Sequence, residues 1–158
     1  MGKSTHASGA AAAQVAYITR PSAIPDVEAF GMPSETRAAM AWFNQAERQD
    51  RKNARVADRI IVALPLDSDH EERISLLRDF CTELTGRKVP HIAAIHDKGK
   101  DTNNPHAHIL VRDRDLESGR GRVLRWSGSP ADREAAGLPK NAKKHIREVW
   151  EAQVNRAL

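Results

Sequence analysis

The chain has 158 residues, of which 40% are hydrophobic and 29% are charged. This length suits one globular domain and is too short for two, and the composition excludes an intrinsically disordered chain. No apolar run approaches the ~18 residues of a membrane-spanning helix, and the first residues lack the apolar stretch of a signal peptide. Cys81 is the single cysteine and has no partner for an internal disulfide, so we expect a cytoplasmic protein without membrane insertion.

The charge balance is moderately basic. Lys and Arg number 25 against 21 Asp and Glu, which gives a formal net charge of +4 with neutral histidines, and the basic excess lies toward the C-terminal half. Such a charge permits a polyanionic partner but is equally typical of a solvated surface with mixed charges. The charge alone therefore does not indicate a function.

The first third of the chain predicts two helices. Small helix-forming residues favour a helix from residue 8 that ends near Tyr17, because Pro21 stops it. Residues 20–33 hold three prolines and are interpreted as a loop. Ser34 can cap a second helix over about residues 34–50, with apolar side chains near its middle.

The middle of the chain predicts a strand and then a helix. The β-branched stretch Arg59–Pro65 is short and closed by proline, as is typical of a strand. Asp69 stands three residues before Glu72, which resembles a capping box, and helical spacing of apolar residues continues to Leu84. Gly86 is a natural C-terminal stop for this helix.

The C-terminal half predicts a hairpin followed by a helix. Residues 89–96 and 106–113 are interpreted as strands, and residues 97–105 between them have turn composition. We expect a short strand at Arg122–Trp126 and a last helix at 140–157. Strands joined by a tight turn are antiparallel, so the fold class predicted is α+β, a two-layer sandwich with an antiparallel sheet, a central metal-binding hairpin and helices on one face.

The histidines of this hairpin are the most informative residues. In a strand, His106 and His108 project from the same face, and His96 ends the preceding strand. Side chains on paired strands lie roughly 5 Å apart, so one register brings the three imidazoles together. Three imidazoles leave coordination positions open on a metal, as in catalytic sites, and they suit zinc, manganese, iron or copper better than magnesium. A His-x-His pair is common without a metal, and the addition of His96 is what favours a metal site.

Tyr17 is the only tyrosine in the chain and is predicted at the end of the first helix. A phenol has a pKa near ~10 and is a better nucleophile beside a cation or a base. A metal ion can in turn polarise a phosphate for attack. A lone tyrosine more often belongs to a core or a surface, but beside a three-histidine metal site it is a candidate for phosphodiester chemistry.

Four segments, in the family's order, resemble the relaxase domain of mobilisation proteins of the MobA/MobL (MobQ-like) type, within the His-hydrophobic-His class of single-strand endonucleases. The most specific resemblance is that of Ala94-Ile95-His96-Asp97 through Asn104-Pro105-His106-Ala107-His108-Ile109-Leu110 to the three-histidine metal motif. The others are the small-residue helix Ser8–Tyr17 followed by Ile18-Thr19-Arg20, the strand Ile61-Val62-Ala63-Leu64-Pro65, and the closing Arg147-Glu148-Val149-Trp150 with Val154-Asn155-Arg156-Ala157-Leu158. We therefore expect residues 1–158 to form one relaxase-like nuclease domain.

The resemblance implies a bacterial enzyme that nicks one DNA strand at a plasmid transfer origin during conjugative mobilisation. Tyr17 would attack the scissile phosphate, form a 5′-phosphotyrosine and release a 3′-hydroxyl, and the reverse reaction would rejoin the strand. His96, His106 and His108 would hold one divalent metal ion, Mn²⁺ or Mg²⁺ with Zn²⁺ as the alternative, to stabilise charge on the phosphate. The implied partners are single-stranded DNA at the transfer origin and accessory mobilisation and secretion-coupling proteins.

Basic residues after the metal strand are candidates for tracking the DNA backbone. They are interleaved with acidic residues, so a solvated surface is an equally good interpretation of each. Trp126 is a candidate for base stacking, because aromatic residues are few. The basic candidates are Arg112, Arg114, Arg120, Arg122, Arg125, Lys143 and Lys144.

Two features of the family differ in this sequence. Relatives usually have a strand before the tyrosine helix, and we expect this domain to lack it, together with any helicase or primase region. Relatives also often place a carboxylate on the strand before Ala-Leu-Pro, where it orients a metal-bound histidine, whereas this chain has Arg59-Ile60-Ile61-Val62. Asp58 and Asp97 are the nearest candidates for that orienting role.

Three alternatives remain open from the sequence. A nucleotide hydrolase of the histidine-triad type needs His-x-His-x-His, and Leu110 at the third position disfavours it. A truncated, non-catalytic relaxase remnant would still bind single-stranded DNA. A rolling-circle replication initiator would share the same chemistry.

Overall fold

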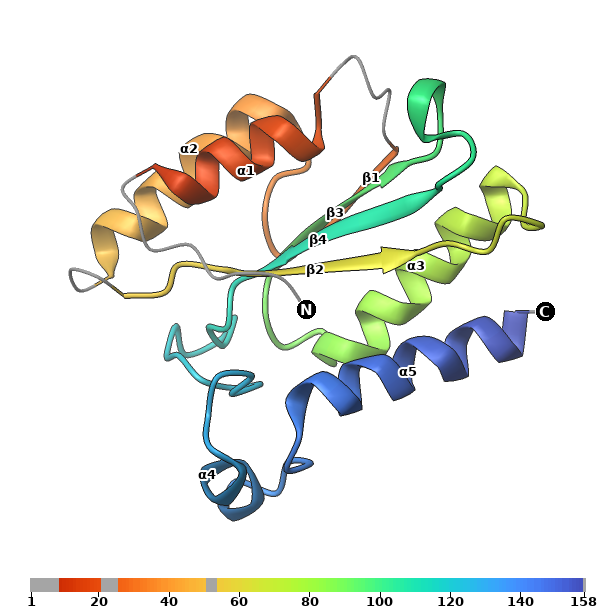
Figure 1. The fold of residues 1–158 in the computed structure, drawn as a ribbon. Coiled ribbons are helices and arrows are strands. Elements are labelled where there is room, and N and C mark those ends of the chain that lie inside the picture. Colours follow the sequence, from red (N-terminus) through yellow and green to blue (C-terminus); the bar gives the residue numbers. More distant parts are fainter. Residues whose placement is uncertain (1–8, 21–25, 51–53, 158) are drawn as a thin grey trace.

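The computed structural model describes residues 9–20, 26–50 and 54–157, and a four-stranded antiparallel sheet forms its centre (Figure 1). The strands are β1 (Asp26–Phe30), β2 (Asp58–Ala63), β3 (His91–His96) and β4 (His106–Val111). Their spatial order is β1-β3-β4-β2, so the β3–β4 hairpin occupies the middle of the sheet. The connection of the hairpin contains a 3-10 turn at Gly99–Asp101, as its turn-forming composition predicts.

Two helices cover one face of the sheet, α1 (Ala10–Ile18) and α2 (Thr36–Gln49). Val15 of α1 and Phe43 of α2 are fully buried against side chains of β3 and β4. The first turn of α1 is tied to α2, because the Gly9 N–H donates to both carboxylate oxygens of Glu47 at 3.0 and 3.1 Å. α1 is therefore fixed along its length on this face.

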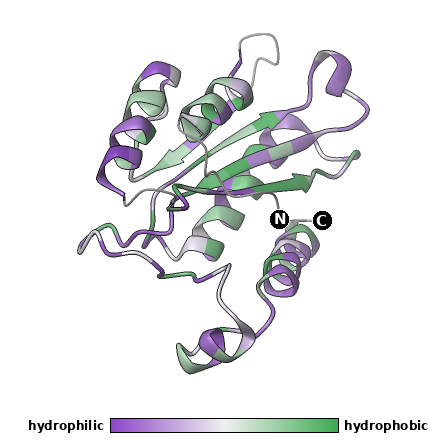
Figure 2. Cartoon of the chain, turned by 60° about the vertical axis from the view of Figure 1, so that its left-hand side comes forward, coloured by the Kyte–Doolittle hydropathy of each residue, from purple (hydrophilic) through white to green (hydrophobic). Residues whose placement is uncertain are grey.

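The helices α3 (His70–Thr85) and α5 (Ala142–Ala157) cover the opposite face. The predicted capping box is present, with Asp69 and Glu72 bonded reciprocally to each other's backbone, and Gly86 ends α3 in the left-handed conformation that glycine tolerates, with φ 60°. Phe80 of α3 stacks edge-to-face with Trp150 of α5, with ring centroids 5.0 Å apart. The strands are mostly green and the helices mix green with purple in Figure 2, as expected when each helix turns one face to a hydrophobic sheet.

The α+β class, the antiparallel sheet and the central hairpin are confirmed, but helices lie on both faces of the sheet instead of one. The reason lies in the central strand β3, all of whose residues are buried. Ile92 and Ala94 face the α1–α2 layer, whereas Ala93 and Ile95 face the α3–α5 layer. A strand that is apolar on both sides needs a helical layer on each, so the sandwich has three layers.

Two expectations about connections were wrong. The interval 20–33 contains the edge strand β1, which pairs with β3 from Asp26↔Ile95 to Phe30↔His91. Residues 122–126 are irregular, with a bend and the first residue of a turn instead of a strand, and a short helix, α4 (Pro130–Ala135), follows them.

The strand that relatives have before the tyrosine helix would fall on residues 1–8, outside the described residues. Among the helices that the structure describes, none combines the length and the hydrophobicity of a transmembrane span.

Candidate active site

The three histidines of the hairpin converge at one end of the sheet. His96 ends β3 and is directly opposite His106, the first residue of β4, and His108 follows on the same face. Their ring centroids are 4.7 to 5.2 Å apart. One ligand nitrogen from each ring lies within 4.8 Å of the others, a spacing that could hold a metal ion.

Backbone carbonyls determine which ring nitrogens face the cluster. His96 Nε2–H donates to the Ile18 carbonyl at 2.7 Å, and His106 Nδ1–H donates to the Asn104 carbonyl at 2.8 Å. Because a carbonyl only accepts, these bonds leave His96 Nδ1 and His106 Nε2 with free lone pairs. His96 Nδ1 and both nitrogens of His108 are buried without a hydrogen-bond partner among the described residues. The donor set therefore fits a metal ion, and two of its rings are oriented by carbonyls, as metal-bound histidines commonly are.

The surroundings favour the neutral form of two of the three imidazoles, those of His96 and His108. The pKa of His108 is lowered to about 4, chiefly by burial and secondarily by the neighbouring His96, His106, Arg59 and Arg20. Burial also lowers the pKa of His96, and the bond to the Ile18 carbonyl opposes this only in part. Neutral imidazole is the form that binds metal ions.

Tyr17 lies beside the histidines, on the last turn of α1. Its ring centroid is 5.8 Å from that of His108 and 6.3 Å from that of His96, both in edge-to-face arrangements. The side chain is 52% exposed, so a large substrate can approach the phenol from solvent. The Arg20 guanidinium lies over the ring, 4.2 Å from its centroid. The structure thus brings together the four residues that the sequence singled out for chemistry.

The two carboxylates proposed to orient the histidines have other partners. Asp97 accepts hydrogen bonds from His70 Nδ1 at 2.7 Å and from Arg73 Nη1 at 3.3 Å, and His70 Nε2 contacts Asp26. Burial raises the pKa of Asp97, but these hydrogen bonds outweigh it, so the net direction is downward. Asp58 pairs with Arg55 at 3.3 Å, at the end of β2 remote from the histidines. Neither carboxylate orients the cluster, and the carbonyls of Ile18 and Asn104 take that role.

Two of the predicted DNA contacts are buried. Arg112 is 6% exposed and binds both carboxylate oxygens of Asp50, at 2.6 and 2.8 Å, and the Val56 carbonyl. Trp126 is also 6% exposed and packs in the core between the sheet and the α3–α5 layer. Both side chains hold the fold together, and we withdraw them from the candidate DNA contacts.

The other basic candidates lie at or beyond the far end of β4. Arg114 is half-exposed and pairs with Asp50 at 3.1 Å, and Lys144 lies 3.9 Å from Glu148, both with exposed side chains on α5. Arg122 and Arg125 have left-handed backbones, with φ 67° and 52°, which is strained for residues with a Cβ and is often found at functional sites. Arg120 and Lys143 are exposed, so all six keep side chains available to solvent.

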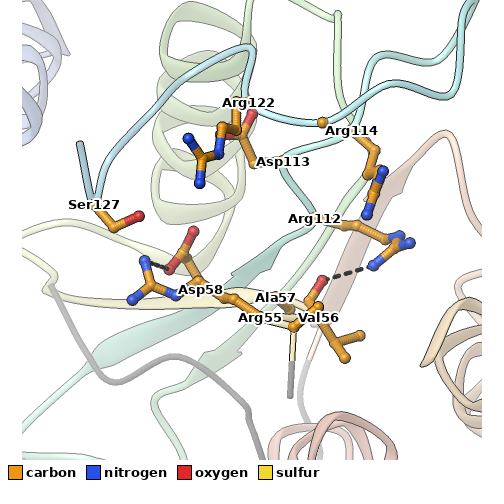
Figure 3. Close-up of a pocket in the computed structure, with 11 residues that line it drawn as sticks. Arg55, Val56, Ala57, Asp58, Arg112, Asp113, Arg114, Arg122 and Ser127 are labelled. Atoms are coloured by element: carbon orange, nitrogen blue, oxygen red, sulfur yellow. Dashed lines mark hydrogen bonds and ion pairs between the residues drawn. The ribbon is translucent and has the colours of Figure 1, made fainter. Parts of the chain in front are cut away.

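A cavity of about 550 Å³ opens beside several of these arginines (Figure 3). It lies between the start of β2 and the segment that follows β4, at the end of the sheet opposite the histidines. From Ala63, beside His106, to Asp58 the strand β2 covers five steps, or ~17 Å. Its charged lining residues are Arg55, Asp58, Arg112, Asp113, Arg114 and Arg122.

Two residues near the cluster were missed in the sequence. Arg20 follows Tyr17 by three positions, just beyond the C-cap Thr19 of α1, and its guanidinium lies over the Tyr17 ring. Arg59 lies on the same face of β2 as Ile61, which is directly opposite His108, and its charge contributes to the low pKa of His108. The alternation of β2 was sufficient to put Arg59 on this face, but only the pairing register shows which histidine it accompanies.

Comparison with known proteins gives consistent matches. Residues 14–158 match the model of the MobA/MobL family. The chain is 28% identical over 138 residues to Mobilization protein A of Escherichia coli, covering 80% of this chain and 19% of that protein. It is 37% identical over 89 residues to a probable mobilization protein MobA of Bifidobacterium longum (strain NCC 2705), covering 55% of this chain and 16% of that protein. The chain thus spans a fifth or less of the length of the curated relatives it matches.

A solved structure has the same fold. It comes from work on the molecular basis of vancomycin resistance transfer in Staphylococcus aureus, and the two superpose with a TM-score of 0.61. The match covers 84% of this chain and 69% of the other at 24% sequence identity, which supports a shared arrangement of helices and strands.

Proposed function

The chain belongs to the MobA/MobL family, and we propose that it nicks and rejoins one DNA strand at a transfer origin during plasmid mobilisation. The observation that carries the proposal is the position of the only tyrosine, edge-on to two histidines of a cluster that could hold a metal ion. A merely DNA-binding remnant would not need a nucleophile and a metal-type donor set in one place. The accessory mobilisation and secretion-coupling proteins belong to the same proposal.

In the proposed reaction Tyr17 Oη attacks the phosphorus of one phosphodiester. A P–O bond forms to the phenol, the P–O3′ bond breaks, and the proton lost by the phenol balances the one gained by the 3′-hydroxyl. The products are a 5′-phosphotyrosine and a free 3′ end. One phosphoester replaces another, so the 3′-hydroxyl can attack the adduct and rejoin the strand. The 52% exposure of Tyr17 suits a polymer substrate that approaches from solvent.

The residues that would hold a metal ion are His96, His106 and His108. When bound, a divalent cation supplies Lewis-acid stabilisation of charge on the phosphate oxygens. The protein's contribution is to favour neutral His96 and His108 through burial, and to direct the rings of His96 and His106 through the Ile18 and Asn104 carbonyls. Mn²⁺ is the first ion to test, because imidazole ligands suit it better than Mg²⁺.

The DNA strand is proposed to extend from the histidines toward the basic end of the sheet. At that end Arg114 and Arg122 line the cavity of Figure 3, and Arg125 lines a neighbouring cavity together with Arg122. The strand β2 that separates this end from the histidines is ~17 Å long. At the ~3.4 Å per nucleotide of a stacked strand, ~17 Å corresponds to about five nucleotides, and an extended single strand covers this distance with fewer. The arginines are therefore suited to phosphates several nucleotides from the nick and not to the scissile phosphate itself.

A cleavage assay tests this proposal. Purified protein with Mn²⁺ is mixed with a pool of randomised single-stranded DNA, denatured, and examined for DNA that stays attached to protein. We expect an adduct from the natural sequence, and none from Tyr17→Phe or His106→Ala. An adduct formed equally well by Tyr17→Phe would refute the assignment of the nucleophile. Salt-sensitive DNA binding without any adduct would instead support a non-catalytic fragment.

A further inference from the structure

Arg20 holds the end of the tyrosine helix against the metal hairpin. Its Nη1 donates to the Tyr17 carbonyl at 2.9 Å, and its Nη2 lies 4.0 Å from the carboxylate of Asp101. Asp101 belongs to the 3-10 turn between β3 and β4, the two strands that carry the histidines. The guanidinium therefore spans from α1 to the hairpin.

The same guanidinium confines the Tyr17 ring. It covers one face of the ring at 4.2 Å from the centroid, while His96 and His108 meet the ring edge-on. A tyrosine side chain that is 52% exposed has little packing of its own to hold χ1, so these contacts are what restrict its rotamers. The Arg20 side chain is only 20% exposed and is thus itself well fixed.

We propose that Arg20 is a positioning residue for the nucleophile: it sets the Tyr17 ring beside the histidine cluster and anchors it through Asp101. This inference rests on the proposed function of Tyr17, and it adds a residue that neither binds metal nor forms the covalent bond. A planar guanidinium can stack on a ring while its N–H groups bond in the ring plane, which lysine cannot do equally well. Misplacing a nucleophile by about 1 Å can slow a reaction about a hundred-fold.

The test uses the fact that Tyr17 is the only tyrosine in the chain. In protein labelled with ¹³C on tyrosine rings, a single set of ring resonances reports the environment of Tyr17. The variants are Arg20→Gln, Arg20→Lys and Asp101→Asn. Lys100→Gln is the matched control, because it removes an equal charge from an exposed position next to Asp101. Thermal unfolding of each variant checks that the fold is kept.

For Arg20→Gln we expect the Tyr17 resonances to move toward those of free tyrosine. We also expect the single-turnover rate of adduct formation to fall ten- to a hundred-fold, with the Kd for DNA within about two-fold of the natural protein. Arg20→Lys should have smaller effects than Arg20→Gln on both the Tyr17 resonances and the rate of adduct formation. Asp101→Asn should change the resonances and the rate in the same direction as Arg20→Gln, but by less. Lys100→Gln should change neither of them.

Unchanged Tyr17 resonances in Arg20→Gln would overturn the inference. So would a loss of DNA affinity as large as the loss of rate, because Arg20 would then bind the substrate instead of positioning the nucleophile. The proposed function can fail separately. If the natural protein forms no adduct but Arg20→Gln still moves the resonances, the positioning role stands and the catalytic role of Tyr17 does not.

Discussion

Replacing Asp50 by alanine removes the carboxylate that pairs with buried Arg112. The two side chains are 3% and 7% exposed, and two hydrogen bonds of 2.6 and 2.8 Å join them. Removing one member of a buried ion pair leaves an uncompensated charge and costs about 3–5 kcal/mol. Arg112→Met alone should cost less, because Arg114 still pairs with Asp50 at 3.1 Å. The double variant should regain much of the loss, since neither charge is then left without a partner.

Urea unfolding followed by tryptophan fluorescence measures these differences. With a slope of roughly 2 kcal/mol per molar urea, Asp50→Ala should lower the midpoint by roughly 2 M. The four proteins of the cycle then give the coupling energy of Asp50 and Arg112, which we expect to exceed about 2 kcal/mol. A cost below about 1 kcal/mol for Asp50→Ala would refute the structural role of Arg112 and return it to the candidate DNA contacts.

Three further predictions concern acid stability, metal binding and DNA. Burial and, secondarily, Arg87 lower the pKa of His91 to about 4, so the unfolded chain binds this proton better and the folded state loses stability below about pH 6.5. Between pH 7.5 and 5.5, the free energy of unfolding measured with urea should therefore fall by about 1.4 kcal/mol less in His91→Leu than in the natural protein. Equal losses in the two proteins would contradict this. Mn²⁺ at about a hundred times its Kd should raise Tm by roughly 5–10 °C, a rise that His106→Ala abolishes and the control His145→Ala keeps; a rise retained by His106→Ala would rule out the cluster. Arg122→Gln should lower the slope of log K for DNA against log salt by about one, and an unchanged slope would exclude a phosphate contact.

The hairpin that carries the histidines could be predicted because its signals are local. Residues 97–105 are all turn-forming, and the two flanking strands alternate so that His106 and His108 share a face. The pairing His96↔His106 then follows from the turn length. The helix α3 was equally accessible, since its capping box and Gly86 mark both ends within the segment itself.

Other features depend on partners far away in the chain. β1 is a five-residue strand flanked by prolines, and only its pairing with β3 makes it a strand. The second helical layer depends on both faces of β3 being apolar, which the run Ile92–Ile95 already contains but which was interpreted for one face only. Arg112 resembles a DNA contact in sequence because its partner Asp50 is 62 residues away.

The candidate site also combines features that the sequence signals locally with features that depend on distant partners. Tyr17 and the histidines could be selected by residue type and by family resemblance, but their proximity depends on packing of α1 against the sheet. The orienting carbonyls of Ile18 and Asn104 carry no residue-specific signal, because every residue has a carbonyl. The sequence therefore pointed to the carboxylates Asp58 and Asp97 for this role, and both pair with other residues instead.

Locating the covalent bond tests most directly whether Tyr17 is the nucleophile. After reaction with single-stranded DNA and Mn²⁺, the adduct is digested with nuclease and protease, and the peptide that carries the nucleotide remnant is sequenced by mass spectrometry. We expect one modified peptide, with the phosphate on Tyr17 of α1, and no modified peptide in the absence of divalent metal. A phosphate found on a serine or a histidine, or an adduct that forms in excess chelator, would contradict this expectation.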